Sequence, residues 1–304
     1  MMEGRKPRVV GIGEVLWDIF GEDKRLGGAP LNFAVHAAAL GAAASIISRV
    51  GEDADGDAIL AAVRQFGLPA DAIQRDSSHP TGRVTVSIGS HGQPSFTIME
   101  NVAWDFLEET EVARSLVVAA EAICFGTLAQ RSERSRTTIQ SLLRAAAERG
   151  KVRWFVCDIN FRQHYYCREV VQASLRFANL LKMNEDEVPI LLRLLRTPGR
   201  GERERIRALM ETFALDLVCV TRGERGCVIY SNSAYSEVAG YKVRVADTVG
   251  SGDAFTAALV MRLLAGDPPE AAADFANRVG AYVATQCGAT PALDLDAIQN
   301  MRRA

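Results

Sequence analysis

A glycine-rich turn with an aspartate, close to the carboxyl end of the chain, carries the clearest chemistry. The segment D-T-V-G-S-G-D-A-F spans residues 247–255 and lies between a β-like run at 241–245 and a helical pattern. Gly250 and Gly252 permit a tight turn. The free N–H groups and the dipole of the following helix would then bind an anion such as phosphate. A carboxylate at Asp253 would repel that phosphate unless it accepts a proton from the attacking group.

This segment therefore predicts a phosphoryl-transfer site that carries its own general base. Backbone N–H groups from Gly250 to Asp253 would hold the charge that develops on the transferred phosphoryl group. The alternative is a plain turn in which Asp253 caps the helix, a common role for aspartate.

A second glycine element, G-G-A-P-L-N at residues 27–32, opens another helix near the start of the chain. Pro30 suits the first helical turn, and Gly41 can end the alanine-rich run that follows. Asn32 can point its amide at a polar ligand from this first turn. The two glycine elements therefore fit one site that is assembled from opposite ends of the chain.

Composition places the chain among ordinary globular proteins. It has 304 residues, 48% of them hydrophobic, and a formal net charge of −2, so no basic excess indicates nucleic acid. The short charged start at residues 1–8 does not resemble a signal peptide, and no apolar run reaches the roughly 20 residues of a membrane span. Six cysteines without C-x-x-C spacing indicate buried free thiols and a cytoplasmic protein: Cys124, Cys157, Cys167, Cys219, Cys227 and Cys287.

Short β-branched runs alternate with longer helical patterns along most of the chain. Strands are expected at 8–13, 44–50, 120–125, 152–157, 179–183 and 217–221, and helices at 57–66, 132–149 and 206–213. This alternation predicts an α/β fold with a mainly parallel sheet and helices on both faces. Two segments, 17–26 and 81–99, break this rhythm with alternating strand-like residues, and the second contains a turn region at Gly92–Pro94. The arginine-rich stretch 193–207 is expected to be a solvated helix–loop–helix connection.

The two glycine elements together resemble the signatures of the ribokinase-like (PfkB) carbohydrate kinase family. Further motifs agree in order and spacing from about residue 9 to 291: G-E at 13–14 with Asp18, R-V-G-E-D at 49–53, D-I-N-F-R at 158–162, N-E-D-E at 184–187 and T-R-G-E-R-G at 221–226. Within the family the chain most resembles bacterial fructokinases, with 2-keto-3-deoxygluconate kinases next.

The resemblance implies a three-layer α/β/α domain over residues 1–304, with a small β-sheet lid from segments at about 15–27 and 81–103. It implies ATP-dependent phosphorylation of a primary hydroxyl of a small sugar, with D-fructose as the leading acceptor. The implied partners are the sugar and ATP, with no nucleic acid or membrane. A homodimer through the lid strands is expected, which would cover exposed strand edges.

The resemblance also implies residue roles. Asp253, with Gly250, Ser251 and Gly252, would serve catalysis, and serine stands where the family usually has alanine. The acceptor would be bound by Asp18, Gly27, Gly28, Asn32 and Arg162. The nucleotide would lie against Asn184, Thr221, Gly223, Gly226, Gly250, Gly252 and Asn277.

Two cation sites are implied in the same way. Glu187 would lie near a hydrated Mg²⁺, an ion that prefers oxygen ligands and keeps its waters. Asp247 and Val249, with carbonyl groups at 283–288, correspond to the family's monovalent-cation loop and would hold K⁺.

Simpler interpretations remain for several of these residues. Asn184 and Glu187, placed one helical turn apart, could form an ordinary helix cap, and Arg162 could pair with Asp158. The four histidines show no metal-ligand spacing. For the whole chain, the alternatives are a 2-keto-3-deoxygluconate kinase, another sugar or nucleoside kinase, or a non-catalytic regulator that binds sugar or nucleotide.

Overall fold

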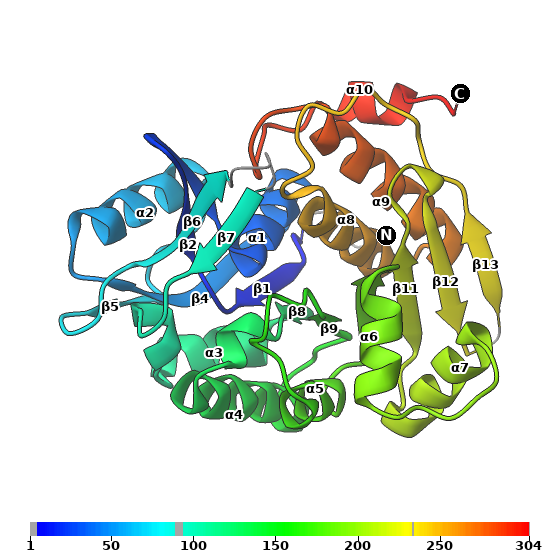
Figure 1. Ribbon diagram of the computed structural model, residues 1–304, viewed down its shortest axis with the longest axis horizontal. Coiled ribbons are helices and arrows are strands. Elements are labelled where there is room, and N and C mark those ends of the chain that lie inside the picture. The colour runs from blue at the N-terminus through cyan, green and yellow to red at the C-terminus, as the bar shows by residue number, and fades with distance from the viewer. Residues whose placement is uncertain (1–4, 89–93, 233, 304) are drawn as a thin grey trace.

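The computed structural model describes residues 5–88, 94–232 and 234–303, and a large sheet forms its centre (Figure 1). From one edge to the other, its nine strands in these residues are β13 (Tyr235–Val238), β12 (Cys227–Ser231), β11 (Leu217–Thr221), β10 (Leu180–Asn184), β9 (Trp154–Asp158), β8 (Ala122–Phe125), β1 (Arg8–Ile12), β4 (Ala43–Gly51) and β5 (Ile73–Asp76). All neighbours pair in parallel except β11–β12 and β12–β13, which are antiparallel. The predicted mainly parallel sheet is confirmed.

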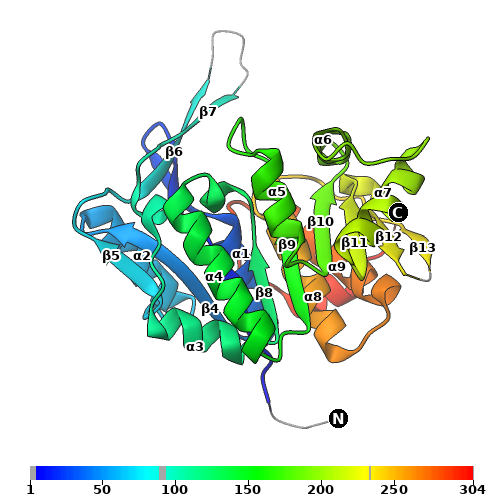
Figure 2. The same cartoon turned by 90° about the horizontal axis from the view of Figure 1, so that it is seen from below.

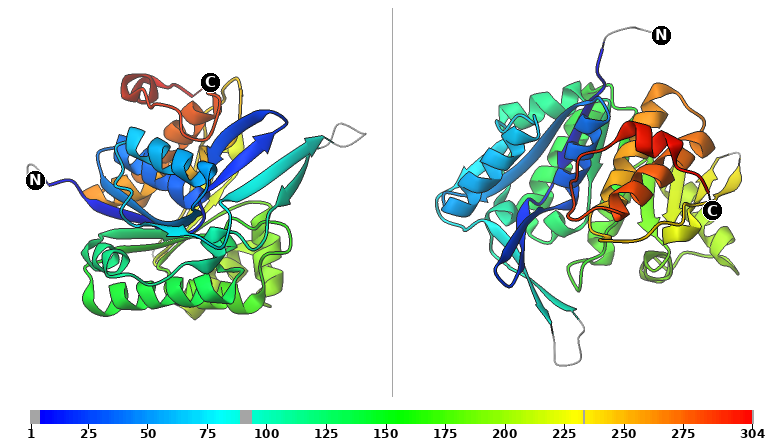
Figure 3. Two further views of the ribbon diagram at one scale, coloured as in Figure 1. Left: turned by 90° about the vertical axis from the view of Figure 1, so that its left-hand side faces the viewer. Right: turned by 90° about the horizontal axis from the view of Figure 1, so that it is seen from above.

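Helices cover both faces of this sheet, which gives the three layers visible in Figures 2 and 3. One face carries α1 (Ala29–Ala39), α2 (Ala54–Gln65), α8 (Ser251–Ala265), α9 (Pro269–Ala284) and α10 (Leu295–Asn300). The other carries α3 (Glu111–Ala119), α4 (Glu133–Arg149), α5 (Arg168–Leu175), α6 (Glu187–Leu194) and α7 (Glu202–Phe213). Short 3₁₀ turns lie at η1 (Ala103–Phe106), η2 (Leu128–Gln130) and η3 (Gly223–Arg225).

Strand periodicity divides the core between the two faces. Val9 and Ile46 pack with α1, α8 and α9, whereas Val10 and Ile47 pack on the opposite side with α3 and α4. Successive side chains of a strand point to opposite faces, so a strand covered by helices on both sides must be apolar throughout. This explains the continuous β-branched runs in the sequence.

A second, four-stranded sheet projects from the body, as Figures 2 and 3 show. Its order is β3 (Asp23–Gly27), β2 (Leu16–Phe20), β6 (Gly82–Ile88) and β7 (Pro94–Ile98). These strands come from the two segments that were expected to form a lid. The predicted turn at Gly92–Pro94 lies outside the described residues, except for Pro94, which begins β7.

Some element boundaries differ from the predictions. Residues 241–245 form no strand; their apolar side chains line a hollow beside α9 instead of joining the sheet. The antiparallel pair β12–β13 was not predicted. Helix α2 begins earlier than expected because Asp53 caps it, accepting a hydrogen bond from the N–H of Gly56 at 2.8 Å.

The cysteines are free thiols as predicted, but only four of the six are buried as expected. Cys124, Cys157, Cys219 and Cys227 are buried and unbridged, and Cys167 and Cys287 are exposed. Among the described residues, no helix has both the length and the apolar character that crossing a membrane requires.

Candidate active site

Predicted site residues from β10, β11 and the start of α8 lie at the carboxyl edge of the parallel strands, where open α/β sheets bind ligands. Glu14 follows β1, Asp158 ends β9, Asn184 ends β10 and Thr221 ends β11. The amino end of α8 meets this edge, with Asp253 in its first turn.

The turn into α8 depends on glycine at position 250. Gly250 has a φ of 78° in the left-handed region, and an added Cβ would lie 2.2 Å from the carbonyl oxygen of Ala289. A larger residue would therefore displace the loop around Ala289 or unwind the turn.

The first turn of α8 leaves two backbone donors available. The N–H of Ser251 donates to the Thr248 carbonyl at 3.2 Å, and the first i→i−4 bond of the helix is that of Ala254, at 2.8 Å. The N–H groups of Gly252 and Asp253 precede this bond and have no carbonyl one turn earlier within the helix. Within the predicted run of donors from Gly250 to Asp253, the N–H of Ser251 is therefore already engaged by the turn. The hydroxyl of Ser251 is buried and has no partner within the described chain.

A hydrogen bond joins the two glycine elements. The Asn32 side chain, 4% exposed in the first turn of α1, donates from Nδ2 to Oδ2 of Asp253 at 2.7 Å. These residues are 221 positions apart in sequence. The predicted juxtaposition of the two corners is therefore present. The Oδ1 atom of Asn32 is buried and has no partner in the part of the chain described.

Burial, together with the nearby carboxylate of Asp158, raises the pKa of Asp253 to about 6. Lys182, the hydrogen bond from Asn32 and the charge of Arg162 act in the opposite direction. A carboxylate in this range is ionised at neutral pH yet basic enough to accept a proton.

Two further acids, Glu14 and Asp18, share with Asp253 the influence of the Arg162 charge. Burial raises the pKa of Glu14 to about 7, although Arg162 opposes this, and its Oε2 atom has no partner in the described residues. Burial likewise raises the pKa of Asp18 to about 6, against the charges of Arg162 and Arg25. Glu14 appeared in the sequence only as part of a motif, without a role.

Gly27 makes room for the carboxylate of Asp18. A Cβ on Gly27, at the end of β3, would lie 2.4 Å from Oδ2 of Asp18 on the neighbouring strand β2. Gly28 is the residue before α1. Arg162 is exposed in the loop after β9, and Asp158 is hydrogen-bonded to Lys182, not to Arg162.

A hollow of about 240 Å³ adjoins the amino end of α8 on its other side. Its lining includes five residues that were predicted to contact the nucleotide, Thr221, Gly223, Gly226, Gly252 and Asn277, together with Ser251 and side chains of the 241–245 segment. The Nδ2 atom of Asn277 donates to the carbonyl groups of Val238 and Ala239, both at 3.3 Å.

Asn184 and Glu187 cap each other at the start of α6. The Asn184 N–H donates to Oε2 of Glu187 at 2.8 Å, and the Glu187 N–H donates to Oδ1 of Asn184 at 2.9 Å. The prediction that they lie one helical turn apart was wrong, because Asn184 ends a strand. The N–H of Phe161 donates to Oε1 of Glu187 at 2.8 Å, and burial raises the pKa of this carboxyl.

Asp247 connects three segments. Its Oδ1 accepts from the N–H of Val249 at 3.0 Å, and its Oδ2 accepts from the N–H of Gly288 at 3.2 Å and pairs with Arg25 at 3.1 Å. Across the residues described, no group of three or more His, Cys, Asp or Glu side chains could hold a metal ion.

Sequence reasoning missed a buried ion pair below the site. The Nζ atom of Lys182 lies 3.0 and 3.2 Å from the carboxylate oxygens of Asp158, and the hydroxyl of Thr256 donates to the same carboxylate at 3.0 Å. The only signal for it was a lysine inside the otherwise apolar strand L-L-K-M-N.

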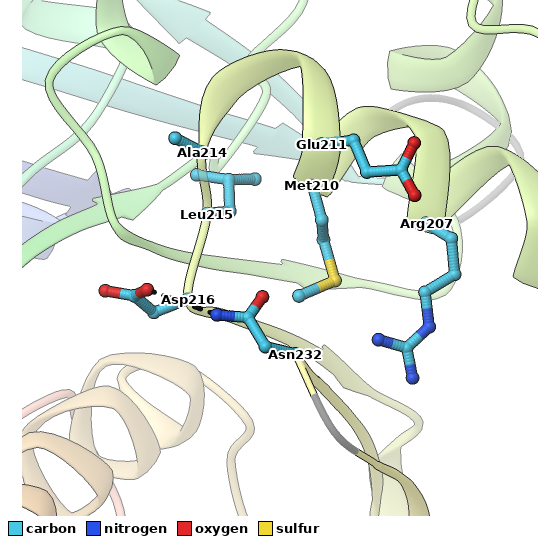
Figure 4. A pocket seen from close by; sticks show the side chains of 7 residues that line it. All are labelled: Arg207, Met210, Glu211, Ala214, Leu215, Asp216 and Asn232. Atoms are coloured by element: carbon cyan, nitrogen blue, oxygen red, sulfur yellow. Dashed lines mark hydrogen bonds between the residues drawn. The ribbon is translucent and has the colours of Figure 1, made fainter.

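Another hollow, of about 420 Å³, lies beside α7 at the amino end of β11 (Figure 4). Asp216 and Asn232 lie side by side there, 3.4 Å apart between Oδ1 and Nδ2. None of the predicted site residues lines it.

Comparison with known proteins gives the family. Residues 13–295 match the pfkB family carbohydrate kinase model, and the chain belongs to this family. The chain is 31% identical over 299 residues to a fructokinase of Escherichia coli, covering 93% of this chain and 94% of that protein.

Solved structures agree with this assignment. A fructokinase of Xylella fastidiosa with bound ATP superposes with a TM-score of 0.85 at 24% identity, covering 97% of this chain and 99% of that one. A fructokinase of Vibrio cholerae O395, bound to fructose, ADP and calcium, gives 0.82 at 25% identity, covering 97% and 98%. The protein has the ribokinase-like fold and is a carbohydrate kinase of the pfkB family.

Proposed function

We propose that this kinase transfers the γ-phosphoryl group of ATP to the primary hydroxyl of D-fructose, giving fructose 6-phosphate and ADP. The observation that carries this proposal is the 2.7 Å contact between Asn32 and Asp253. It joins the acceptor corner to the anion site of α8, so an alcohol held by one would meet a phosphate held by the other. The choice of fructose rests on the fructokinases to which the chain is similar.

Asp253 is the proposed general base. Its Oδ atoms accept the proton of the attacking hydroxyl as the sugar oxygen bonds to the γ-phosphorus and the bond to the β,γ-bridging oxygen breaks. The transition state is loose, so positioning and charge stabilisation outweigh covalent work. The N–H groups of Gly252 and Asp253 would stabilise the charge on the transferred group, and the unpartnered hydroxyl of Ser251 is a further donor for it.

The acceptor would be held by acids and amides around the first glycine element. Asp18 accepts sugar hydroxyls, and Asn32 uses its free Oδ1 for another. Gly27 and Gly28 let the backbone approach the sugar. Glu14 joins this set, because its buried, unpartnered Oε2 lies among charges that also act on Asp253.

The nucleotide would occupy the hollow beside α8. Thr221, Gly223 and Gly226 would pass close to its phosphates, Gly250 and Gly252 would shape the turn against the γ-phosphate, and Asn277 lies further along the hollow on the adenine side. Asn184, which caps α6, would contact the phosphates from the edge of the cleft.

The cation sites are proposals of the same kind. Both oxygens of Glu187 accept backbone hydrogen bonds, which fixes the carboxylate so that its remaining lone pairs can accept a magnesium-bound water. This fits a hydrated Mg²⁺ held mainly by phosphates, and such an ion would neutralise charge on the transferred group. K⁺ would lie among carbonyl groups of the two loops that Asp247 joins, near Val249.

One observation favours a second acceptor. Arg162 is exposed beside the acceptor acids, and a guanidinium there can bind a substrate carboxylate in two places. This suits 2-keto-3-deoxygluconate, which is an acid, better than fructose.

A coupled assay of ADP release decides between these acceptors. We expect the highest kcat/KM with fructose, compared with 2-keto-3-deoxygluconate, ribose and a nucleoside. A preference for the acidic sugar would replace the proposal with the second acceptor. Sugar binding by calorimetry without ADP release from any acceptor would indicate a non-catalytic regulator.

The cellular setting belongs to the same proposal. Four buried free thiols are typical of a reducing compartment, and we place the enzyme in the cytoplasm. We expect a homodimer through β3 and β7, the outer strands of the lid sheet, which sedimentation analysis can test.

A further inference from the structure

The buried ion pair between Lys182 and Asp158 lies where the two central strands of the site run side by side. Lys182 is the register partner of Asp158 across β10 and β9, and their side chains are only 9% and 6% exposed. The hydroxyl of Thr256, in the second turn of α8, donates to the same carboxylate. The pair therefore connects the centre of the sheet to α8.

The lysine reaches the backbone of the anion site. A Cβ on Gly252 would lie 3.1 Å from Nζ of Lys182, so the ammonium group lies directly beneath the residue that precedes Asp253. Glycine at 252 therefore makes room for a cation as well as for a turn.

Stability alone does not explain such a pair. Two charges lose their hydration on burial, and a hydrophobic pair of similar volume is often equally stable or more stable. The chemistry of the site therefore explains the burial of this ion pair better than stability does.

Several charged or polar groups surround Asp253, each from a different element. Asp158 comes from β9, Lys182 from β10, Arg162 from the loop after β9 and Glu14 from the segment after β1. Asn32 of α1 contributes a neutral donor. In this set the ion pair supplies one charge of each sign from the protein interior, where screening is weak.

We propose that Lys182 and Asp158 are positioning residues that hold the amino end of α8 and set the proton affinity of Asp253. The proposal rests on the proposed role of Asp253 as the base. The two members act in opposite directions, since the anion of Asp158 favours protonated Asp253 and the cation of Lys182 favours the ionised form. Burial alone lowers the pKa of Lys182, but the carboxylates of Asp158, Asp253 and Glu187 raise it to about 12, so the cation persists at working pH.

The test measures the acid limb of the pH profile, that is, the apparent pKa below which kcat/KM falls. Lys182→Met should raise this apparent pKa by about one unit, and Asp158→Asn should lower it by about one unit. The charge-neutral double variant should return to within about 0.5 unit of wild type. Thr256→Val, which removes a donor to Asp158 without changing charge, is the matched control and should move the limb by less than about 0.3 unit.

A second readout needs no turnover. The carboxyl ¹³C resonance of Asp253, assigned by its loss in Asp253→Asn, should titrate with the same opposite shifts in the two single variants. Either single variant that keeps its far-UV circular dichroism decides the matter, because the expected directions differ. Shifts of the same sign in both single variants, or no shift in a folded one, would overturn the proposal. A wild-type protein inactive on every sugar would refute the proposed function, and the resonance would still test the ion pair.

Discussion

The two sides of the proposed site differ in chemical character. On the acceptor side, Glu14, Asp18 and Asp253 are acids whose pKa values burial raises to about 7, 6 and 6. On the nucleotide side, the hollow is lined largely by glycines, small side chains and apolar residues around Asn277. The first side contains titratable carboxylates, whereas the second contains backbone N–H donors and a hollow of defined shape.

This difference suggests a division of work. A loose phosphoryl-transfer transition state needs the nucleotide phosphates to be positioned, which backbone groups do without changing their charge. The acceptor hydroxyl must also lose a proton, which needs a group of adjusted pKa. Substitutions on the acceptor side should therefore change rate and pH dependence, whereas those on the nucleotide side should change the KM for ATP.

The largest expected effect is that of Asp253→Asn. The amide keeps the shape but accepts no proton, so kcat should fall by about 10²- to 10⁴-fold, while the Kd for ADP stays within about twofold. Turnover is measured by coupled ADP release and affinity by calorimetry. The exposed Asp71, changed to Asn, is the matched control and should keep wild-type turnover. A variant at position 253 with undiminished kcat would remove Asp253 as base.

Asp18→Asn should come next. Loss of a charged acceptor for sugar hydroxyls should lower kcat/KM for fructose by about 10- to 100-fold, with the KM for ATP unchanged. Steady-state kinetics with each substrate varied in turn separates the two constants. An increase confined to the KM for ATP would reverse the comparison.

The third prediction concerns stability. The pKa of Glu14 is raised from 4.5 to about 7 in the folded protein, so the native state binds more protons than the unfolded state between these values, and stability should decrease as pH rises through this window. Glu14→Gln removes this ionisation. The free energy of unfolding of the variant minus that of wild type should therefore be about 1–3 kcal/mol larger at pH 8 than at pH 4. Urea unfolding at both pH values measures this difference. A pH-independent difference between variant and wild type would contradict the burial of a titrating acid.

A smaller effect is expected on the nucleotide side. Asn277→Leu removes two hydrogen bonds, to the carbonyls of Val238 and Ala239, that shape the hollow. The KM for ATP should rise about three- to tenfold and the KM for fructose should not change. A raised KM for fructose would contradict the assignment of Asn277 to the nucleotide side.

The smallest effect should come from Arg25→Ala. This residue joins lid strand β3 to Asp247 at 3.1 Å, but its side chain is 44% exposed. Such pairs contribute at most about 1 kcal/mol, so kcat/KM should fall less than about fivefold, and less again at 0.5 M salt because of screening. A loss as large as that of Asp18→Asn would show that the lid contact matters more than its exposure indicates.

The sequence predicted the parts of the fold and site that depend on local pattern. Apolar strands between helical runs indicated the parallel sheet, and each glycine element marked a helix start with a polar residue in its first turn, Asn32 or Asp253. Residues 241–245 misled because the same apolar alternation suits the wall of a hollow as well as a strand.

Lys182 could not be predicted from local pattern. Its partner, Asp158, lies 24 residues away, and their pairing depends on β9 and β10 being neighbours in register. The same limit applies to Glu14, which is buried and lies beside the turn before α1, where a Cβ on Gly28 would come within 2.4 Å of the Glu14 carbonyl oxygen. Long-range contacts of this kind are fixed by the assembled sheet.

A crystal structure of the enzyme with fructose and a non-hydrolysable ATP analogue would test the central claim most directly. We expect the primary hydroxyl oxygen within about 2.6–3.2 Å of a carboxylate oxygen of Asp253. We also expect the terminal phosphate against the N–H groups of Gly252 and Asp253. A sugar bound away from Asp253, or a terminal phosphate on another surface, would contradict the proposed function.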